Sequence, residues 1–259
     1  MPGESEELGR GRPARAEPLR GEPLRPVEAH RERERAEIVG LWEEGRKNYG
    51  LEVQVSAKWD RAYRCPGQYV TLRLPGMRAR FFVIARRSDP GRWEFLIDRE
   101  GGFGQALGER QVGDPVEVSA PEGEGFDAQE AAGKVALLFC TGSGVAAVRS
   151  LVATWLVASE ESRPREVVLY YGEEEEGVGT YEALFREWKQ EGVQIHFAVE
   201  RGKRDGEVTV GFVQDAFRAY RVPLEEAVIY LSGAPVMIEA VKALMESEGV
   251  SPEQMKTNY

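Results

Sequence analysis

Two glycines follow a strongly apolar segment at a spacing suited to phosphate binding. Leu137–Cys140 leads into Thr141, Gly142, Ser143, Gly144 and Val145, and Ala147 completes a G-x-G-x-x-A pattern. In this pattern the first glycine permits a tight turn, the second lets the backbone approach a pyrophosphate, and the small third residue lets a helix pack on the strand. Free N–H groups at the start of that helix then face the phosphates. The pattern also occurs in ordinary strand–helix turns, but its place after an apolar strand favours binding of a dinucleotide.

Two later turns are expected at the same end of the predicted sheet. Tyr171-Gly172 precedes Glu173–Glu176, at a place where a residue that binds ribose would lie. Four carboxylates there would repel a 2′-phosphate, which favours NADH over NADPH, although a solvated acidic loop explains them equally well. Ser232-Gly233-Ala234-Pro235 starts another helix, with proline near its first position. On physical grounds alone this second segment is only a turn.

Shorter motifs occupy the first half of the chain. Pro66-Gly67-Gln68-Tyr69 opens one predicted strand, and Arg80-Phe81-Phe82-Val83 begins another. Gly101–Gly104 offers backbone N–H groups that are able to cradle a phosphate. Taken one at a time, each motif is more typical of a structural turn or strand.

The elements that must position these residues change in type along the chain. Short segments rich in Val, Ile, Phe and Tyr predict a small antiparallel barrel or sandwich with one short helix near 104–107. Strands then alternate with helices, which predicts βαβ units and a parallel sheet. We therefore expect a two-domain β + α/β fold, with an antiparallel β-barrel domain at 34–130 and a Rossmann-like α/β domain at 131–259. The predicted strands are 36–42, 51–57, 68–74, 81–85, 93–98, 115–119, 135–140, 167–171, 193–199, 227–232 and 254–259, and the later helices are 147–159, 180–190, 211–220 and 236–248.

Composition restricts the classes of partner. Residues 1–33 are rich in Arg, Glu and Pro with few large apolar side chains, which predicts a disordered tail. The net charge of −10 argues against nucleic acid as a partner. Two cysteines and two histidines form no metal-ligand pattern. The chain has no apolar run long enough to span a membrane and no apolar signal core, so we expect a cytoplasmic protein.

Taken together and in this order, the motifs resemble the ferredoxin–NADP reductase superfamily over about residues 34–259. Within it the chain is most similar to a plant and bacterial branch, the "fruit protein" type, on the basis of the Thr-Gly-Ser-Gly turn, the Tyr-Tyr-Gly motif and the terminal Asn258-Tyr259 pair. The resemblance implies that FAD, or less often FMN, binds between the two domains. It also implies that NADH or NADPH supplies hydride and that electrons pass on to an unidentified acceptor, a protein among the candidates.

The resemblance also implies roles for individual residues. Arg80 would meet the flavin pyrophosphate, Phe81, Phe82 and Val83 would line the flavin, and N–H groups in the motif Gly101, Gly102, Phe103, Gly104 and Gln105 would hold phosphate. Thr141, Gly142, Ser143, Gly144 and Val145 would hold the nucleotide pyrophosphate, with Gly172 and Gly233 nearby. Ser232 and Met237 would flank the nicotinamide, and Tyr259 would stack on the flavin and move aside for nicotinamide. Ser232 and Tyr259 are thus the expected catalytic residues.

Six positions depart from the family pattern, Phe82, Val83, Gly104, Ala147, Ser232 and Ala234, and three of them weigh most against flavin chemistry. Val83 stands where the family usually has Ser or Thr, Gly104 where a Ser is expected, and Ser232 where a Cys is customary. Each change removes a polar group near the flavin or the nicotinamide. They keep a second interpretation open, a non-catalytic binding or regulatory module that has lost flavin or turnover. The intact glycine turn, Arg80 and Tyr259 favour the oxidoreductase.

Overall fold

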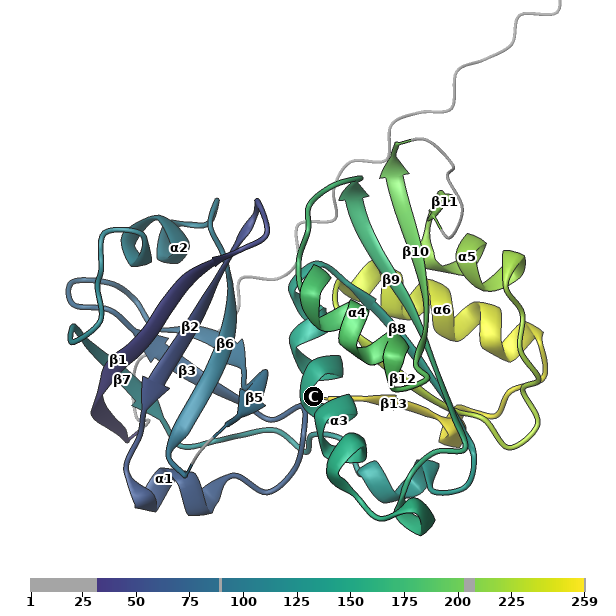
Figure 1. The fold of residues 1–259 in the computed structure, drawn as a ribbon, viewed down its shortest axis with the longest axis horizontal. Helices are drawn as coiled ribbons and strands as arrows, with labels where there is room; N and C mark the ends of the chain where they lie inside the picture. Colours follow the sequence, from purple (N-terminus) through teal and green to yellow (C-terminus); the bar gives the residue numbers. More distant parts are fainter. Residues whose placement is uncertain (1–31, 89, 203–207, 259) are drawn as a thin grey trace, which may run out of the picture.

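The chain folds around two β-sheets that lie side by side (Figure 1). The computed structural model describes residues 32–88, 90–202 and 208–258. The predicted tail, apart from its last two residues, lies outside the described residues, as does Tyr259. One sheet is antiparallel and the other is parallel, so the predicted β + α/β fold class is confirmed.

The first sheet curls into a barrel. Its strands follow the order β4-β3-β7-β1-β2-β6-β5. The chain joins the two edges where it leaves β4, because Ile84 N donates to Gln68 O and Ala85 N donates to Glu94 O. The strands are β1 (Arg33–Glu44), β2 (Asn48–Gln54), β3 (Tyr69–Arg73), β4 (Arg80–Val83), β5 (Arg86–Arg87), β6 (Arg92–Asp98) and β7 (Pro115–Ser119).

Two short helices accompany the barrel, α1 (Ala57–Ala62) and α2 (Gly102–Leu107). The strand predicted at 51–57 is wrong at its end. Ser56 caps a helix there, with its hydroxyl accepting from Trp59 N. Trp59 is then buried against the barrel core, which overrides the β-like composition of this segment.

The second sheet has the order β11-β10-β9-β8-β12-β13. Alternate residues of its central strand face opposite layers. Ala136, Leu138 and Cys140 pack with α3 and α4, while Leu137 and Phe139 pack with α5 and α6. Burial on both faces explains the continuous apolar run. The elements are β8 (Val135–Thr141), the 3-10 turn η2 (Gly142–Gly144), α3 (Val145–Val157), β9 (Glu166–Glu175), α4 (Glu182–Gln190), β10 (Gln194–Arg201), β11 (Val208–Val210), α5 (Val213–Ala219), β12 (Val228–Ser232), α6 (Pro235–Ser247) and β13 (Met255–Thr257).

The strand order reverses between β8 and β12. The chain runs outward from β8 through β9 and β10 to β11, then returns to place β12 on the other side of β8. In an open α/β sheet, ligands bind beyond the carboxyl ends of the strands at such a switch point. The glycine-rich turn after β8 and the Ser232-Gly233 turn after β12 both lie there.

The two sheets share packed apolar contacts. Ala85, Leu96 and Phe126 belong to the same buried cluster as Val148 and Leu151 of α3. The path from β12 through α6 to β13 brings the end of the chain back between the two sheets (Figure 1). Within the described residues, no helix is long and apolar enough to cross a membrane.

Candidate functional site

A cleft of about 790 Å³ lies where the two sheets meet. The barrel contributes the β1–β2 turn, β4 and β6, and the α/β half contributes the carboxyl-end parts of β9 and β10 and the turns after β8, β11 and β12. Of the predicted site residues, the cleft brings together Phe81, Phe82, Val83, Thr141, Gly142, Ser143, Gly144, Gly172, Ser232, Gly233 and Met237. Residues from both halves of the prediction therefore share one cavity.

The glycine-rich turn has the predicted strand–turn–helix form. Gly142 has a φ of +51°, in the left-handed region that favours glycine. Ser143 is exposed at the tip. Val145 lies buried beneath the turn, and its N–H donates to the carbonyls of Gly142 and Ser143. The Val145 N–H is therefore engaged inside the turn, unlike the free donor expected from the sequence.

Gly144 is held by a close protein contact. A Cβ at this position would lie 2.4 Å from Ser232 O and 2.6 Å from Gly233 Cα. Both distances are shorter than any real Cβ contact, so no side chain fits. The sequence argument assigned this glycine to the approach of a pyrophosphate. In the structure it lets the β8 turn pack directly on the β12 turn.

The β12 turn is tied to the end of β8 by side chain and backbone. Thr141 Oγ1 accepts from Ala234 N at 3.2 Å, which orients the first turn of α6. Ser232 is buried, and Pro235 occupies the first helical turn. Val236 is 78% exposed at the mouth of the cleft, while Met237 turns inward and is buried.

Two helix N-termini thus converge on the cleft. The N-cap residues, Gly144 of α3 and Ala234 of α6, provide no side-chain cap for the N–H groups of the first helical turn. The first N–H groups of an α-helix have no partner within the helix, and the helix dipole makes that end positive. This arrangement suits an anion such as a pyrophosphate.

The barrel side of the cleft includes an apolar wall. Phe82, Val83 and Leu96 line it, and Phe82 packs on Phe103 with ring centroids 4.8 Å apart. Phe81 packs edge-on against Tyr69 with its ring centroid 5.5 Å away. Arg80 is exposed beside Phe81 at the start of β4 but does not line the cavity.

The Gly101–Gln105 motif lies behind this wall. Its residues begin α2 and do not line the cleft, whereas Glu100 just before them does. Position 104 requires glycine for a steric reason, because a Cβ there would lie 1.9 Å from Asp98 O. The serine that the family pattern expects at 104 does not fit this backbone. By contrast, no described atom lies within 4 Å of a Cβ at Gly102.

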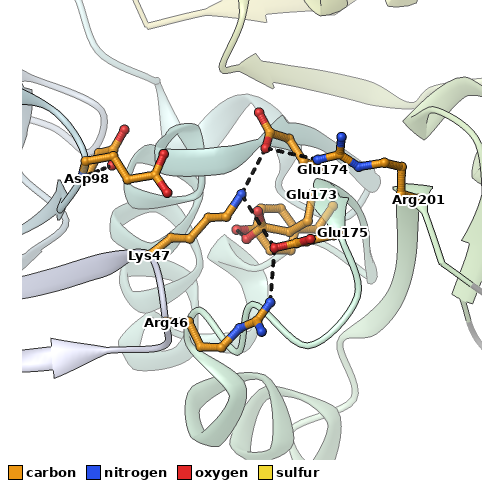
Figure 2. A network of polar contacts seen from close by, with 9 residues as sticks. Arg46, Lys47, Asp98, Glu173, Glu174, Glu175 and Arg201 are labelled. Atoms are coloured by element: carbon orange, nitrogen blue, oxygen red, sulfur yellow. Dashed lines mark hydrogen bonds and ion pairs between the residues drawn. The ribbon is translucent and has the colours of Figure 1, made fainter.

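Two glutamates of the acidic run, Glu174 and Glu175 at the carboxyl end of β9, are paired with basic side chains (Figure 2). Lys47 Nζ lies 2.9 Å from Glu174 and 4.0 Å from Glu175. Arg46 approaches Glu175 at 3.1 Å, and Arg201 approaches Glu174 at 3.9 Å. The hydrogen bond from Lys47 lowers the pKa of Glu174. The repulsion of a 2′-phosphate argued from four bare carboxylates is therefore weaker than the sequence indicated.

Glu173 has a different environment from its neighbours. It faces the cleft, and the Tyr171 hydroxyl donates to its Oε1. Burial raises the pKa of Glu173 and outweighs the opposing hydrogen bond from Tyr171. The same Tyr171 hydroxyl lies 3.4 Å from the Gly142 carbonyl. One buried tyrosine, Tyr171, thus connects the glycine-rich turn to Glu173.

Several cleft residues had no local signal in the sequence. They are Lys47, Asn48, Asp98, Glu200 and Phe212. Lys47 and Asn48 come from the β1–β2 turn, about 90 residues before the glycine-rich turn, so only the fold brings them here. Phe212 is 60% exposed, which marks it as a ligand-facing aromatic only once the structure is known. Tyr259 lies outside the described residues.

Comparison of sequences agrees with this arrangement. Residues 138–243 match the oxidoreductase NAD-binding domain family. The fruit protein pKIWI502 of Actinidia deliciosa is 29% identical over 225 residues, covering 78% of this chain and 69% of that protein. The propane 2-monooxygenase reductase component of Rhodococcus jostii is 28% identical, covering 73% of this chain and 54% of that protein. The chain thus spans little more than half the length of this second relative.

Solved structures agree on the fold. The ferredoxin reductase in carbazole 1,9a-dioxygenase superposes with a TM-score of 0.73 at 22% identity, covering 88% of this chain and 69% of that chain. A ferredoxin NADP⁺ reductase from Neisseria gonorrhoeae, with bound FAD and NADP, superposes with a TM-score of 0.70 at 15% identity, covering 88% of this chain and 99% of that chain. The resemblance predicted from the motifs is confirmed: residues 138–243 match the oxidoreductase NAD-binding domain family, and the chain has the fold of the ferredoxin reductases.

Proposed function

We propose that this protein is a flavoprotein reductase that passes electrons from NADH or NADPH, through bound FAD, to an unidentified acceptor. The observation that carries the proposal is the single cleft lined by the apolar barrel wall on one side and the glycine-rich turn on the other. A hydride donor and a flavin must meet in such a cavity, and each half of the chain supplies one wall.

The α/β half fits a dinucleotide. The uncapped N-termini of α3 and α6 supply backbone N–H groups for the pyrophosphate. Gly172, Gly233, Ser232 and Met237 also line the cleft. Ser232 is the residue we assign to the nicotinamide, together with Tyr259 as the predicted movable aromatic.

The barrel half fits the flavin ring more clearly than its phosphates. Phe82, Val83 and Leu96 form an apolar wall of the kind that a flat ring system packs against. Arg80 lies at the edge of this wall with an exposed guanidinium, and we assign it to the flavin pyrophosphate. The N–H groups of α2 at Gly102 and Phe103 are assigned to the same phosphates. When bound, FAD would supply the acceptor for the hydride that a reduced nicotinamide gives up.

NADH is the preferred donor in this proposal, with NADPH as the alternative. Although Lys47, Arg46 and Arg201 offset part of the acidic run, Glu173, Glu174 and Glu200 all line the cleft. A further phosphate would meet these carboxylates. Comparing the dissociation constants of NAD⁺ and NADP⁺ tests this preference.

We propose that the functional division follows the predicted boundaries, with the flavin domain at 34–130 and the nucleotide domain at 131–259. The named relatives include a reductase component of a monooxygenase, which supports a protein acceptor. The acidic chain, with its net charge of −10, disfavours an acceptor that is itself strongly acidic.

An absorbance spectrum from 300 to 600 nm, recorded on the purified protein before and after anaerobic addition of NADH, tests the function. Flavin bands that bleach on addition of NADH are the expected result. Absence of flavin bands after incubation with FAD and with FMN would overturn the proposal. That outcome would favour the non-catalytic module, which the loss of a hydroxyl at Val83 makes the second candidate.

A further inference from the structure

A buried ion pair joins the two halves of the molecule behind the cleft. Arg149 of α3 donates through Nη1 to Glu94 Oε1 of β6. Their side chains are only 10% and 6% exposed. The nucleotide half supplies one charge and the barrel supplies the other, so neither half contains a complete pair.

Neighbouring contacts hold the Arg149 side chain in its orientation toward Glu94. Its guanidinium lies over the Tyr181 ring, 4.6 Å from the ring centroid. Tyr181 is itself buried, and its N–H donates to Glu44 of the barrel at 3.0 Å. The next residue of α3, Ser150, accepts from Gly67 N of the barrel at 2.9 Å. Consecutive residues of α3 thus contact two separate parts of the barrel, strand β6 and the segment just before β3.

The pair connects the two walls of the cleft through short, rigid segments. Arg149 lies little more than one turn of α3 after Gly144, which lines the cleft. Glu94 lies two residues before Leu96, which lines the opposite wall. The Glu94 carbonyl also accepts from Ala85 N, just after Val83 at the end of β4. Any shift of Arg149 relative to Glu94 therefore changes the separation of the two walls.

We infer that the Arg149–Glu94 pair is a positioning device that sets the distance between the glycine-rich turn and the barrel wall. This inference rests on the proposed function. Dinucleotide binding uses N–H groups that all belong to the α/β half, so it does not depend on this distance. Hydride transfer needs both walls in register, because displacement of reacting atoms by about 1 Å can slow a reaction about 100-fold. The pair therefore controls the rate of transfer and leaves nucleotide affinity unchanged.

The positioning role of the pair can be separated experimentally from its contribution to folding stability. A buried ion pair is often no more stabilising than apolar residues of similar volume, because both charges lose their hydration. Two apolar side chains can replace the contribution of the ion pair to stability. They cannot reproduce the directional contact between the Arg149 guanidinium and the Glu94 carboxylate. The variants below use this difference.

The first test compares Glu94→Gln with the double variant Arg149→Met/Glu94→Leu. Stopped-flow absorbance gives the rate of flavin reduction at saturating NADH, fluorescence titration gives the affinity for NAD⁺, and thermal unfolding gives stability. We expect Glu94→Gln to reduce flavin about 10- to 100-fold more slowly, with the NAD⁺ dissociation constant within about twofold of wild type. The double variant should recover the thermal midpoint while its reduction stays slow. If the double variant recovered both the thermal midpoint and the rate of flavin reduction, the pair would have a structural role alone and the inference would be overturned.

Arg46→Met provides the matched control. It removes an ion pair that also joins the two halves, but whose side chains are 62% and 40% exposed. Reduction should stay within about twofold of wild type, because exposed pairs contribute little. Equal slowing by Arg46→Met and Glu94→Gln would contradict the special role of the buried pair.

A second readout does not depend on the proposed function. Nitroxide labels at Val112→Cys and Val157→Cys, both exposed and in different halves, are placed in a Cys65→Ser background. Double electron–electron resonance then reports the distance distribution between the halves. We expect a narrow distribution that broadens or shifts with Glu94→Gln and remains altered in the double variant. An unchanged distribution overturns the inference, whereas a wild-type protein that is not reduced by NADH overturns only the proposed function.

Discussion

The side-chain amide of Asn258 donates to the carbonyl oxygen of Gly67 at 3.0 Å, across 191 positions of the chain. The N–H of the same glycine donates to Ser150 Oγ. Both backbone polar groups of one barrel residue are therefore satisfied by the α/β half. Asn258 is buried and also lines the cleft, so this contact links the docking of the two halves to the shape of the site.

Replacing Asn258 with Ala should destabilise the protein by about 1–3 kcal/mol, because the buried Gly67 carbonyl loses its partner. The measurement is the free energy of unfolding in urea. Glu246→Ala serves as the control, since Glu246 is exposed on α6 and Ala is a good helix former. Equal stabilities of the Asn258 and Glu246 variants would show that the amide contributes nothing to docking.

Gly144→Ala should destabilise more than Gly142→Ala, although both change a glycine of the same turn. The first places a methyl group against the Ser232 and Gly233 backbone, which has no side-chain freedom to move away. The second places it where no described atom lies within 4 Å, leaving only the strain of a left-handed residue, about 1–2 kcal/mol. Urea unfolding ranks the two variants. NAD⁺ affinity should fall with Gly144→Ala, because the turns after β8 and β12 must separate. The reverse ranking would mean that the contact between the two turns is relaxed in solution.

Restoring the family serine at Gly104 should harm this protein. Gly104→Ser drives a side chain into the Asp98 carbonyl, so α2 must move and the thermal midpoint should fall. Gly102→Ser, two residues earlier, enters open space and should be tolerated. Differential scanning fluorimetry with and without FAD checks both variants. A Gly104→Ser protein that is as stable as wild type and binds FAD more tightly would refute this assignment.

Glu173 and Glu174 should give opposite pH dependences. Burial raises the pKa of Glu173, so folding favours its protonated form. Its contribution to stability is complete below the ordinary carboxyl pKa of about 4.3 and is lost as the pH rises through the folded pKa. Glu173→Gln should therefore stabilise the protein at pH 7 and have little effect at low pH.

Glu174 has a lowered pKa because Lys47 hydrogen-bonds to it. Its contribution is present above the ordinary pKa and is lost as the pH falls through the folded value. Glu174→Gln should slightly destabilise at pH 7 and have no effect in acid. Thermal midpoints from pH 4 to pH 8 compare the two variants. Parallel curves would contradict the assignment of separate environments.

Much of the fold could be predicted because its signals are local. The apolar run of β8 reflects burial on both faces, and the alternation of strands and helices after residue 131 indicates a parallel sheet. Short edge elements escaped prediction. The two-residue β5 and three-residue β11 are too short to show a period, and α1 depends on the cap at Ser56 and the burial of Trp59.

Only part of the site was predictable, because only some of its residues belong to local sequence motifs. Gly142 and the turn after β12 are local motifs, and the structure places both at the cleft. The structural role of Gly144 was not predictable, since the residues it packs against, Ser232 and Gly233, lie about 90 residues later. Arg149 and Glu94 are separated by 55 positions, and only the docked halves bring an arginine and a glutamate of unremarkable context together.

The ion pairs across the junction fall into two classes that dissolved salt should distinguish. Lys47 and Arg46 meet their glutamates at the water-exposed rim, where counter-ions at 0.15 M already screen charges beyond about 8 Å. Arg149 and Glu94 are shielded from those ions by the surrounding protein. Rising ionic strength should therefore release the tip of the β1–β2 hairpin while the deeper contact keeps the halves aligned, so that the rim loosens independently of the core of the junction.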